Sequence, residues 1–199
     1  ATLTALGLQY GTAAELYLNL KEEAGDGNRL SPDELPDWAG LYSRDFTQGI
    51  FFDQEQQGLY PDIKLTPEFR AKLERKVEAA SQNIEYDPIS GCFPPGHPRW
   101  LTSPFLREHI IASDQVLLMS EVTNSTRRVY TDGRGHPPPE ERYPLYNGDS
   151  IGFWDNDKLV VHTNQLMSGQ YTRSQPDYTE EIETVEIWQK LDDRRLVVD

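Results

Sequence analysis

A series of short apolar segments, each bounded by turn-forming residues, dominates the second half of the chain. The segments cover residues 108–112, 115–122, 127–131, 150–154, 158–163, 181–191 and 195–198. Turn sequences such as Ser113-Asp114, Asp132-Gly133, Asp155-Asn156-Asp157 and Asp192-Asp193 separate or end them. β-Strands are typically this short, whereas a buried helix needs a longer run. The pattern therefore predicts a mainly β fold of the α+β class, with an antiparallel meander, sandwich or barrel rather than a parallel α/β sheet.

The strand expected at residues 181–191 alternates in polarity. Val185 and Ile187 share one face, and Thr184, Glu186 and Lys190 share the other. Such alternation is typical of an antiparallel sheet with one buried side and one wetter side. Residues 195–198 form the last arm of a hairpin, and a last strand exposes unpaired backbone groups. We therefore expect this C-terminal edge strand to be covered by a loop, by the N-terminal region or by association with another chain.

Two helices precede the strands. Thr12-Ala13-Ala14-Glu15 is a capping-box pattern, which predicts a helix over residues 12–23. Thr66 as N-cap, followed by Pro67, predicts a second helix over residues 67–81. The apolar stripe of that helix, Phe69, Leu73 and Val77, predicts that it packs on the β core. We divide the chain into an N-terminal helical arm, residues 1–34, and a β-rich domain, residues 35–199, that includes helix 67–81 and is expected to continue beyond Asp199.

The composition excludes several classes of protein. The 199 residues carry 33 acidic and 19 basic side chains, a net charge of −14, and such a surface repels the phosphate backbone of nucleic acids. No apolar run approaches the length of a membrane-spanning helix, so the chain is not expected to span a membrane. The single cysteine, Cys92, excludes an internal disulfide and a zinc site of several cysteines. Because Cys92 lies beside Phe93 and Pro94, we expect it to be a small buried apolar residue.

Motifs for common cofactors and metals are absent from the sequence. It contains no G-x-G-x-x-G, Walker A or G-x-S-x-G pattern, which disfavours Rossmann dehydrogenases, P-loop NTPases and hydrolases. The four histidines form no H-x-H or H-E-x-x-H pattern, and His109 lies in an apolar strand where packing is its expected role. We therefore expect neither a cofactor nor a bound metal ion.

Two proline-rich segments interrupt the elements, at residues 83–104 and 132–149. The first also contains many large side chains, which a disordered linker does not need, and this indicates an ordered loop on the body of the domain. Proline lacks a backbone N–H donor, and the two loops carry unlike charges. We expect residues 92–100 and 132–149 to touch, with Arg99 or Arg134 bonded to Asp132 or Asp149, because a guanidinium group suits a carboxylate.

Four segments also share the order and spacing of known sequence elements. Residues 92–99 read C-x-P-P-G-x-P-R, residues 127–137 are close to RRIYTDGRxHP, residues 148–163 are close to GDSIGxWxGDTLVVxT, and residues 35–40 are close to the opening PDWxGxW. Together they resemble a large, uncharacterised family of bacterial proteins, most of which are predicted to be exported. The resemblance covers residues 35–199. Asn156 and His162 depart from it, because the family usually has Gly and Asp at those places.

The resemblance implies an exported protein, so we expect a periplasmic or secreted location. It brings no established catalytic residues. The Gly-x-aromatic opening at Gly40 and Tyr42, followed by a β meander, is also similar to lipocalin-like barrels. A lipocalin-like barrel with the N-terminal helices packed on it is therefore the more specific form of the expected fold.

The strongest candidates for a catalytic or ligand-binding site lie around His136. A histidine near carboxylates can act as a general base, but the same residue types also suit a structural pin in which arginines and carboxylates hold the proline loops. The catalytic candidates are His136, Asp132 and Asp149. The ligand-binding candidates are Arg99, Arg134, His97, Trp100 and Trp154.

Two functions from different classes follow. The favoured one is a non-catalytic module that binds a small apolar or aromatic molecule, or a partner protein, because a curved sheet with aromatic lining makes a suitable pocket. The alternative is a cofactor-free lyase or isomerase that uses His136 with Asp132 or Asp149. An open pocket lined by His136, Asp132 and Arg99 favours the enzyme, whereas interlocked side chains closed to solvent argue against it.

Overall fold

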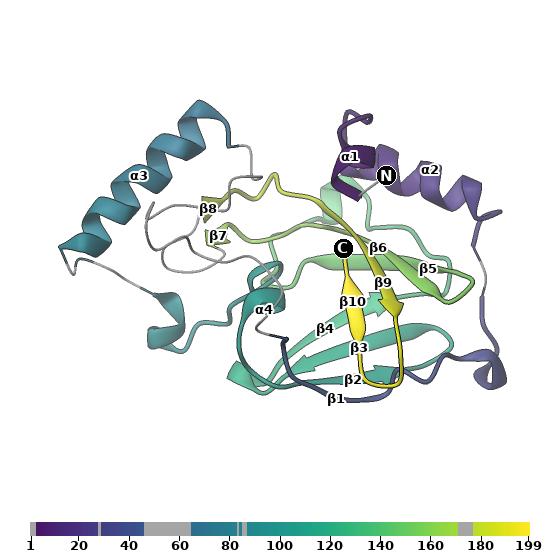
Figure 1. Cartoon of the computed structure of the whole chain (residues 1–199). Helices are drawn as coiled ribbons and strands as arrows, with labels where there is room; N and C mark the ends of the chain where they lie inside the picture. The colour runs from purple at the N-terminus through teal and green to yellow at the C-terminus, as the bar shows by residue number, and fades with distance from the viewer. Residues whose placement is uncertain (1–2, 28, 46–64, 83, 85–86, 171–176) are drawn as a thin grey trace.

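A computed structural model describes residues 3–27, 29–45, 65–82, 84, 87–170 and 177–199. Within them, a curled eight-stranded sheet forms a half-barrel, and helices lie around it (Figure 1). The strands, in sheet order, are β1 Gly40–Tyr42, β2 Arg107–Ile111, β3 Gln115–Ser120, β4 Ser125–Tyr130, β5 Asp149–Asp155, β6 Lys158–Asn164, β9 Thr184–Lys190 and β10 Leu196–Val198. The mainly β, barrel-like fold predicted from the sequence is confirmed.

The remaining elements are short strands and helices. Strands β7 Gly169–Gln170 and β8 Asp177–Tyr178 form a separate two-stranded sheet. The α-helices are α1 Leu3–Gly7, α2 Ala13–Glu23, α3 Pro67–Ser81 and α4 Arg99–Thr102, and the 3₁₀ turns are η1 Pro32–Glu34, η2 Pro88–Gly91, η3 Val122–Asn124 and η4 Pro139–Glu141. Both predicted helices form with the expected caps, since Thr12 and Glu15 make the capping box of α2 and the Thr66 side chain caps α3.

Neighbouring strands of the large sheet pair antiparallel, with one departure. Strand β4 pairs with β5 in parallel, through Val129 opposite Ser150 and Tyr130 opposite Ile151. Parallel neighbours cannot be joined by a tight turn, so the connection must run back along the sheet. Residues 131–148, which contain the second proline-rich segment, make this crossover.

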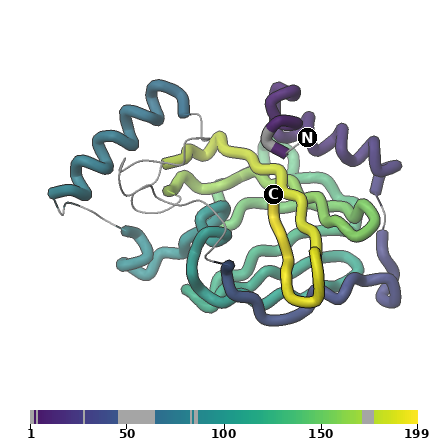
Figure 2. The backbone as a smooth tube through the Cα atoms, viewed as in Figure 1, coloured from purple at the N-terminus to yellow at the C-terminus, as the bar shows by residue number. Residues whose placement is uncertain are grey.

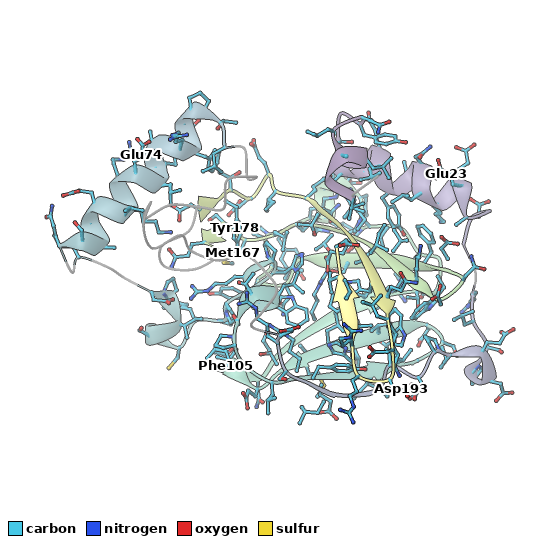
Figure 3. All side chains as sticks on the ribbon, viewed as in Figure 1. Glu23, Glu74, Phe105, Met167, Tyr178 and Asp193 are labelled. Carbon is cyan, nitrogen blue, oxygen red and sulfur yellow. The ribbon has the colours of Figure 1, made fainter. Side chains whose placement is uncertain are left out.

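The sheet is buried on both of its faces at β5 and β6. The inner face contributes to a core of nine buried side chains: Trp38, Trp100, Val116, Leu118, Val129, Trp154, Leu159, Val161 and Trp188. Helix α2 covers the outer face, where Tyr17 packs with Ile151, Phe153 and Val160. Strands buried on both sides read as continuous apolar runs, which explains the sequences of β5 and β6. Side chains fill the space that the curled sheet encloses (Figure 3).

The polar face of β9 points inward, contrary to the wetter side expected for it. Glu186 is buried in the interior, whereas Val185 and Ile187 lie against the N-terminal helices. The predicted alternation is present, but the polar face is the buried one at Glu186. The reason is that α2 covers the apolar face and a buried arginine meets the carboxylate on the other.

Helix α3 does not pack on the eight-stranded sheet as its apolar stripe predicted. Of Phe69, Leu73 and Val77, Leu73 is the buried one, and α3 contacts β8 instead. Figure 1 shows α3 at the side of the molecule beyond β7 and β8, and in Figure 3 its residue Glu74 lies far from Glu23 of α2. Lys76 joins α3 to β8 through an ion pair with Asp177, at 2.6 Å.

Strand β10 lies at one edge of the large sheet, as the sequence predicted for residues 195–198. It pairs with β9, from Leu196 opposite Lys190 to Val198 opposite Trp188. The tube in Figure 2 shows β9 and β10, in yellow, returning the chain toward the N-terminal helices. Among the described residues, no helix is long and apolar enough to cross a membrane.

Candidate functional site

Two histidines and two carboxylates form a continuous hydrogen-bonded chain on the α2 side of the sheet. His136 Nδ1 lies 2.5 Å from Asp149 Oδ1, and His136 Nε2 lies 2.8 Å from His162 Nδ1. His162 Nε2 lies 3.3 Å from Glu183 Oε2. The order is therefore Asp149, His136, His162, Glu183, and we call this set the histidine chain.

The members of the histidine chain come from separate parts of the fold. His136 lies in the crossover between β4 and β5, Asp149 begins β5, His162 lies in β6, and Glu183 directly precedes β9. Helix α2 covers the histidine chain. The ring of Tyr17, in α2, lies 5.4 Å from the His162 ring, centroid to centroid. The histidine chain thus ties the crossover loop to the sheet beneath α2.

The two histidines are more buried than the carboxylates at the ends. The side chains of His136 and His162 are 9% and 3% exposed, whereas those of Asp149 and Glu183 are 19% and 33% exposed. Burial lowers the pKa of His162, the charge of His136 lowers it further, and Glu183 acts in the opposite direction. Both ring nitrogens of His136 have hydrogen-bond partners, so neither is free for a substrate in this arrangement.

Asp132, the other carboxylate expected beside His136, pairs with Arg134. Arg134 Nε lies 3.0 Å from Asp132 Oδ1, and Arg134 Nη2 lies 2.6 Å from Asp132 Oδ2. These hydrogen bonds hold the pKa of Asp132 below its usual value. The Arg134 guanidinium also lies 3.8 Å from the centre of the Tyr130 ring. Of the two candidate carboxylates, Asp149 is the one that contacts His136.

The two proline-rich loops touch, as predicted. The backbone N–H of His97 donates to the carbonyl oxygen of Tyr146 at 2.8 Å. Gly96 permits this approach, because its φ is +69° and a Cβ there would lie 2.5 Å from the same oxygen.

The expected arginine–carboxylate pairs form in part. Arg134 bonds Asp132, but within one loop, whereas Arg99 pairs with Asp87 at 2.8 Å. The Arg99 and Asp87 side chains are 8% and 18% exposed, so this pair is nearly closed to solvent. His136, Asp132 and Arg99 are thus each held by different partners rather than lining one open pocket.

A second polar cluster, which the sequence did not indicate, lies inside the half-barrel. Arg127 donates to both oxygens of Glu186, at 2.9 Å and 2.6 Å, and the two side chains are 1% and 5% exposed. Arg127 also donates to Ser150 at 3.1 Å and to Thr163 at 2.7 Å. Trp188 Nε1 donates to Glu186 at 3.1 Å. The ion pair is thus hydrogen-bonded on every side and joins β4 to β9 across the interior.

His97 belongs to the same buried cluster. Trp100 Nε1 can only donate, so His97 Nδ1, 3.2 Å away, is the acceptor, and the ring proton lies on Nε2. That proton faces Thr184 Oγ1 at 2.9 Å and Glu186 Oε1 at 3.2 Å. Burial and the charge of Arg127 lower the pKa of His97. Burial alone would raise the pKa of Glu186, but the charges and hydrogen bonds of Arg127 and His97 outweigh it and hold the pKa well below the usual range.

Three of the ligand-binding candidates lie in the core. His97, Trp100 and Trp154 are 0%, 2% and 0% exposed. Cys92, by contrast, is exposed, so the expectation of a buried cysteine is wrong. The cause is local, because Cys92 ends η2 in the left-handed region, with a φ of 62°, at a surface turn.

An open hollow of about 660 Å³ lies between the N-terminal helices and β9. It is lined by Leu3, Gly7, Tyr10, Gly11, Thr12, Ala13, Leu16, Val185 and Asp199. None of the eight residues proposed from the sequence as catalytic or ligand-binding is among them. A smaller hollow of about 240 Å³ shares Leu3 and Asp199 with it.

Sequence reasoning missed His162, Glu183, Arg127 and Glu186. The only sequence signal for His162 was that the element that residues 148–163 resemble usually has an aspartate at this place. Arg127 and Glu186 lie 59 positions apart, and nothing local marks them as partners.

Neither metal ligation nor comparison with known proteins assigns a function to these residues. Within the described ranges, no group of three or more His, Cys, Asp or Glu residues is arranged to hold a metal ion. Comparison with protein-family models, with curated proteins and with solved structures gives no match. The function must therefore be argued from the geometry.

Proposed function

We propose that this protein is a non-catalytic binding module that takes a small apolar or aromatic molecule in the hollow between α1, α2 and β9. The observation that carries the proposal is the size and lining of that hollow. Its volume of about 660 Å³ falls within the range of about 300–1,000 Å³ that small-molecule sites occupy. The interior of the half-barrel is filled by side chains, so it is a less suitable place for a ligand.

The lining favours a ligand with a mainly apolar body and one polar end. Leu3, Leu16 and Val185 supply apolar side chains, and Tyr10, Thr12 and Asp199 are polar residues of the lining. The Tyr10 hydroxyl donates to Asn19 at 2.6 Å, which fixes the position of the ring. A hydroxyl or amine group on an aromatic or aliphatic molecule matches this arrangement.

Ala13→Phe tests the proposal, because Ala13 lines the hollow and a phenyl ring there would fill it. The probe is N-phenyl-1-naphthylamine, an apolar dye that fluoresces when it leaves water. We expect the wild-type protein to bind one dye per chain and Ala13→Phe to weaken binding about tenfold or more, which corresponds to about 1.4 kcal/mol.

Ala14→Phe is the matched control. Ala14 is the next residue of α2 and is similarly half-buried, but it does not line the hollow. Its variant should bind the dye as the wild-type protein does. Equal dye affinity in the wild-type protein and in Ala13→Phe would overturn the assignment of the hollow.

A partner protein is the other occupant that fits a binding module. Its support is β10, an edge strand whose outer backbone groups can pair with a strand of another chain. Sedimentation of the protein across a range of concentrations tests association through this edge. Replacing Val198 by proline should abolish any self-association found. Asp199 exchanges both backbone hydrogen bonds with Ile187, so the neighbouring Val198 N–H points away from β9, and proline removes this outer donor.

The alternative function is a cofactor-free lyase or isomerase that uses His136 with Asp149. The 2.5 Å contact between them favours it, because a carboxylate orients an imidazole that acts as a base. Against it, His162 occupies the other nitrogen of His136. We rank this alternative second for that reason.

We propose a periplasmic or secreted location on the strength of the family resemblance alone. Fractionation of cells that express the full-length gene would test it. Recovery of the protein in the cytoplasm would contradict the proposed location without affecting the proposed binding.

A further inference from the structure

The histidine chain has three hydrogen bonds to satisfy. They join Asp149 to His136, His136 to His162 and His162 to Glu183. When both carboxylates are ionised, each of these bonds needs a hydrogen on a ring nitrogen. Two neutral imidazoles carry only two such hydrogens between them. The complete chain therefore requires one proton more than two neutral histidines provide.

We propose that the His136–His162 pair is a proton-binding site that holds one excess proton, and that a second proton, taken up in acid, breaks the bond between the two rings and releases residues 133–142 from the sheet. This site is separate from the hollow and does not depend on the function proposed for it.

The first excess proton belongs on His136. With both nitrogens protonated, His136 donates to Asp149 and to His162 Nδ1. His162 then stays neutral, with its single proton on Nε2, where it faces Glu183. The lowered pKa of His162, caused by burial and by the charge of His136, agrees with this distribution.

The second proton is incompatible with the contact. It would place an N–H on His162 Nδ1 directly opposite the N–H on His136 Nε2, across 2.8 Å. Two donors then face each other, and two positive charges repel in a buried place. One bond of the chain is lost whichever ring moves.

The other charged and titratable groups around the pair do not reverse this result. Asp149 and Glu183 attract a proton from the two ends, and Glu183 opposes the lowering of the His162 pKa. Arg142, in the same crossover loop, adds positive charge and lowers that pKa. Tyr17 covers His162 as a neutral ring, because burial raises the pKa of its hydroxyl.

Residues 133–142 are the part of the crossover that can leave the sheet. Farther along, the backbone of Leu145 is held on both sides, since its N–H donates to Gln165 at 2.8 Å and its carbonyl accepts from Met167 at 2.8 Å. Asn147 is held too, since it donates to Ser125 at 2.9 Å. The contact of His136 with His162 therefore controls the first half of the loop without disturbing the second.

Ring spectra of the full chain with ¹⁵N-labelled histidine test the proton count. Near pH 7 we expect one ring with both nitrogens protonated and one neutral ring with its proton on Nε2, assigned with His136→Gln and His162→Gln. Two neutral rings near pH 7, each titrating independently, would overturn the proposal.

Amide hydrogen exchange tests the release of the loop. Between about pH 7 and about pH 5, after correction for intrinsic rates, exchange in residues 133–136 and 140–142, which carry the amide hydrogens of this segment, should rise about tenfold or more, the loss expected when a charge-assisted hydrogen bond breaks. Amides of β3 report global unfolding and serve as the internal reference.

His162→Asn is the matched variant for the exchange experiment. An asparagine oxygen can accept the hydrogen bond from His136 Nε2 in place of Nδ1, but it binds no proton. Its loop should stay protected where the wild-type loop opens. Equal acid-induced exchange in the two proteins would overturn the proposal, and the ring spectra of the wild-type protein decide the matter if the variant does not fold.

Discussion

Replacing His109 by phenylalanine should remove a large part of the sensitivity of this fold to acid. His109 is 3% exposed in β2, where its ring stacks on Tyr42 at 4.7 Å and meets the edge of Trp188 at 5.8 Å. Neither ring nitrogen has a hydrogen-bond partner in the part of the chain that the structure describes. Burial, aided by the charge of Arg107, lowers the pKa of His109 from 6.5 to about 4.

The pKa shift sets both the sign and the size of the effect. The unfolded chain binds a proton on His109 as the pH falls below about 6.5, whereas the folded chain resists it until about pH 4. The contribution of neutral His109 to the free energy of unfolding is therefore fully present above about pH 6.5. It is lost progressively as the pH falls toward about 4. One pKa unit corresponds to about 1.4 kcal/mol, so the shift is worth about 3 kcal/mol once it is fully expressed.

Urea unfolding of the wild-type protein and of His109→Phe, each at about pH 7.5 and about pH 4.5, measures this term. Phenylalanine keeps the aromatic contacts, so at the higher pH we expect stabilities within about 1.5 kcal/mol of each other. At the lower pH the difference should shift by about 2–3 kcal/mol in favour of the variant. Acid effects of His97, His162 and Glu186 are present in both proteins and cancel in the comparison.

Ile110→Phe is the control, because Ile110 is the next residue of the strand and is 42% exposed. It should lose stability with acid just as the wild-type protein does. If His109→Phe loses as much stability as the wild-type protein between the two pH values, then His109 does not resist protonation in the folded state and the reasoning is refuted.

Three further predictions concern packing. Gly96→Ala should cost about 1–3 kcal/mol in urea unfolding, because its backbone is left-handed and a Cβ would collide with the Tyr146 carbonyl. Leu73→Asp should speed amide exchange in α3 while changing the stability of the large sheet by less than about 0.5 kcal/mol, since α3 lies against β8; cooperative loss of the whole fold would contradict this. Arg127→Met should cost about 3–5 kcal/mol in thermal or urea unfolding because it strands the Glu186 carboxylate, and adding Glu186→Gln should recover part of that loss.

Local signals in the sequence were sufficient to predict most of the strands and the two longer helices. Strands β2 to β6, β9 and β10 form close to their predicted places, and Thr12 and Thr66 cap the two predicted helices. Alternation, turn residues and caps act over a few residues, so they survive whatever the distant parts of the chain do. The contact between the two proline-rich loops was also predictable, although the pairing of Arg99 with Asp87 was not.

The assignment of faces was not predictable, because a period of two says that the faces of a strand differ and not which one is covered. Polarity alone predicts that the face with Thr184, Glu186 and Lys190 is the wetter one. It is buried because Arg127 offers a bidentate partner from β4 and because α2 covers Val185 and Ile187 on the other face. The prediction that α3 packs on the large sheet was wrong for a similar reason. An apolar stripe predicts that one face of a helix is buried, but not which surface buries it.

The histidine chain depends both on local sequence signals and on the geometry of the folded sheet. His136 and Asp149 lie 13 positions apart and were predicted together, but His162 reaches them through sheet geometry. In β5 and β6, Ile151 lies opposite His162, and a slip of one residue would turn His162 into the interior. In a simple meander, the loop after β4 would turn at the end of the sheet. Because β4 and β5 are parallel, the loop instead runs back over the sheet, and this one departure from antiparallel order carries His136 to His162.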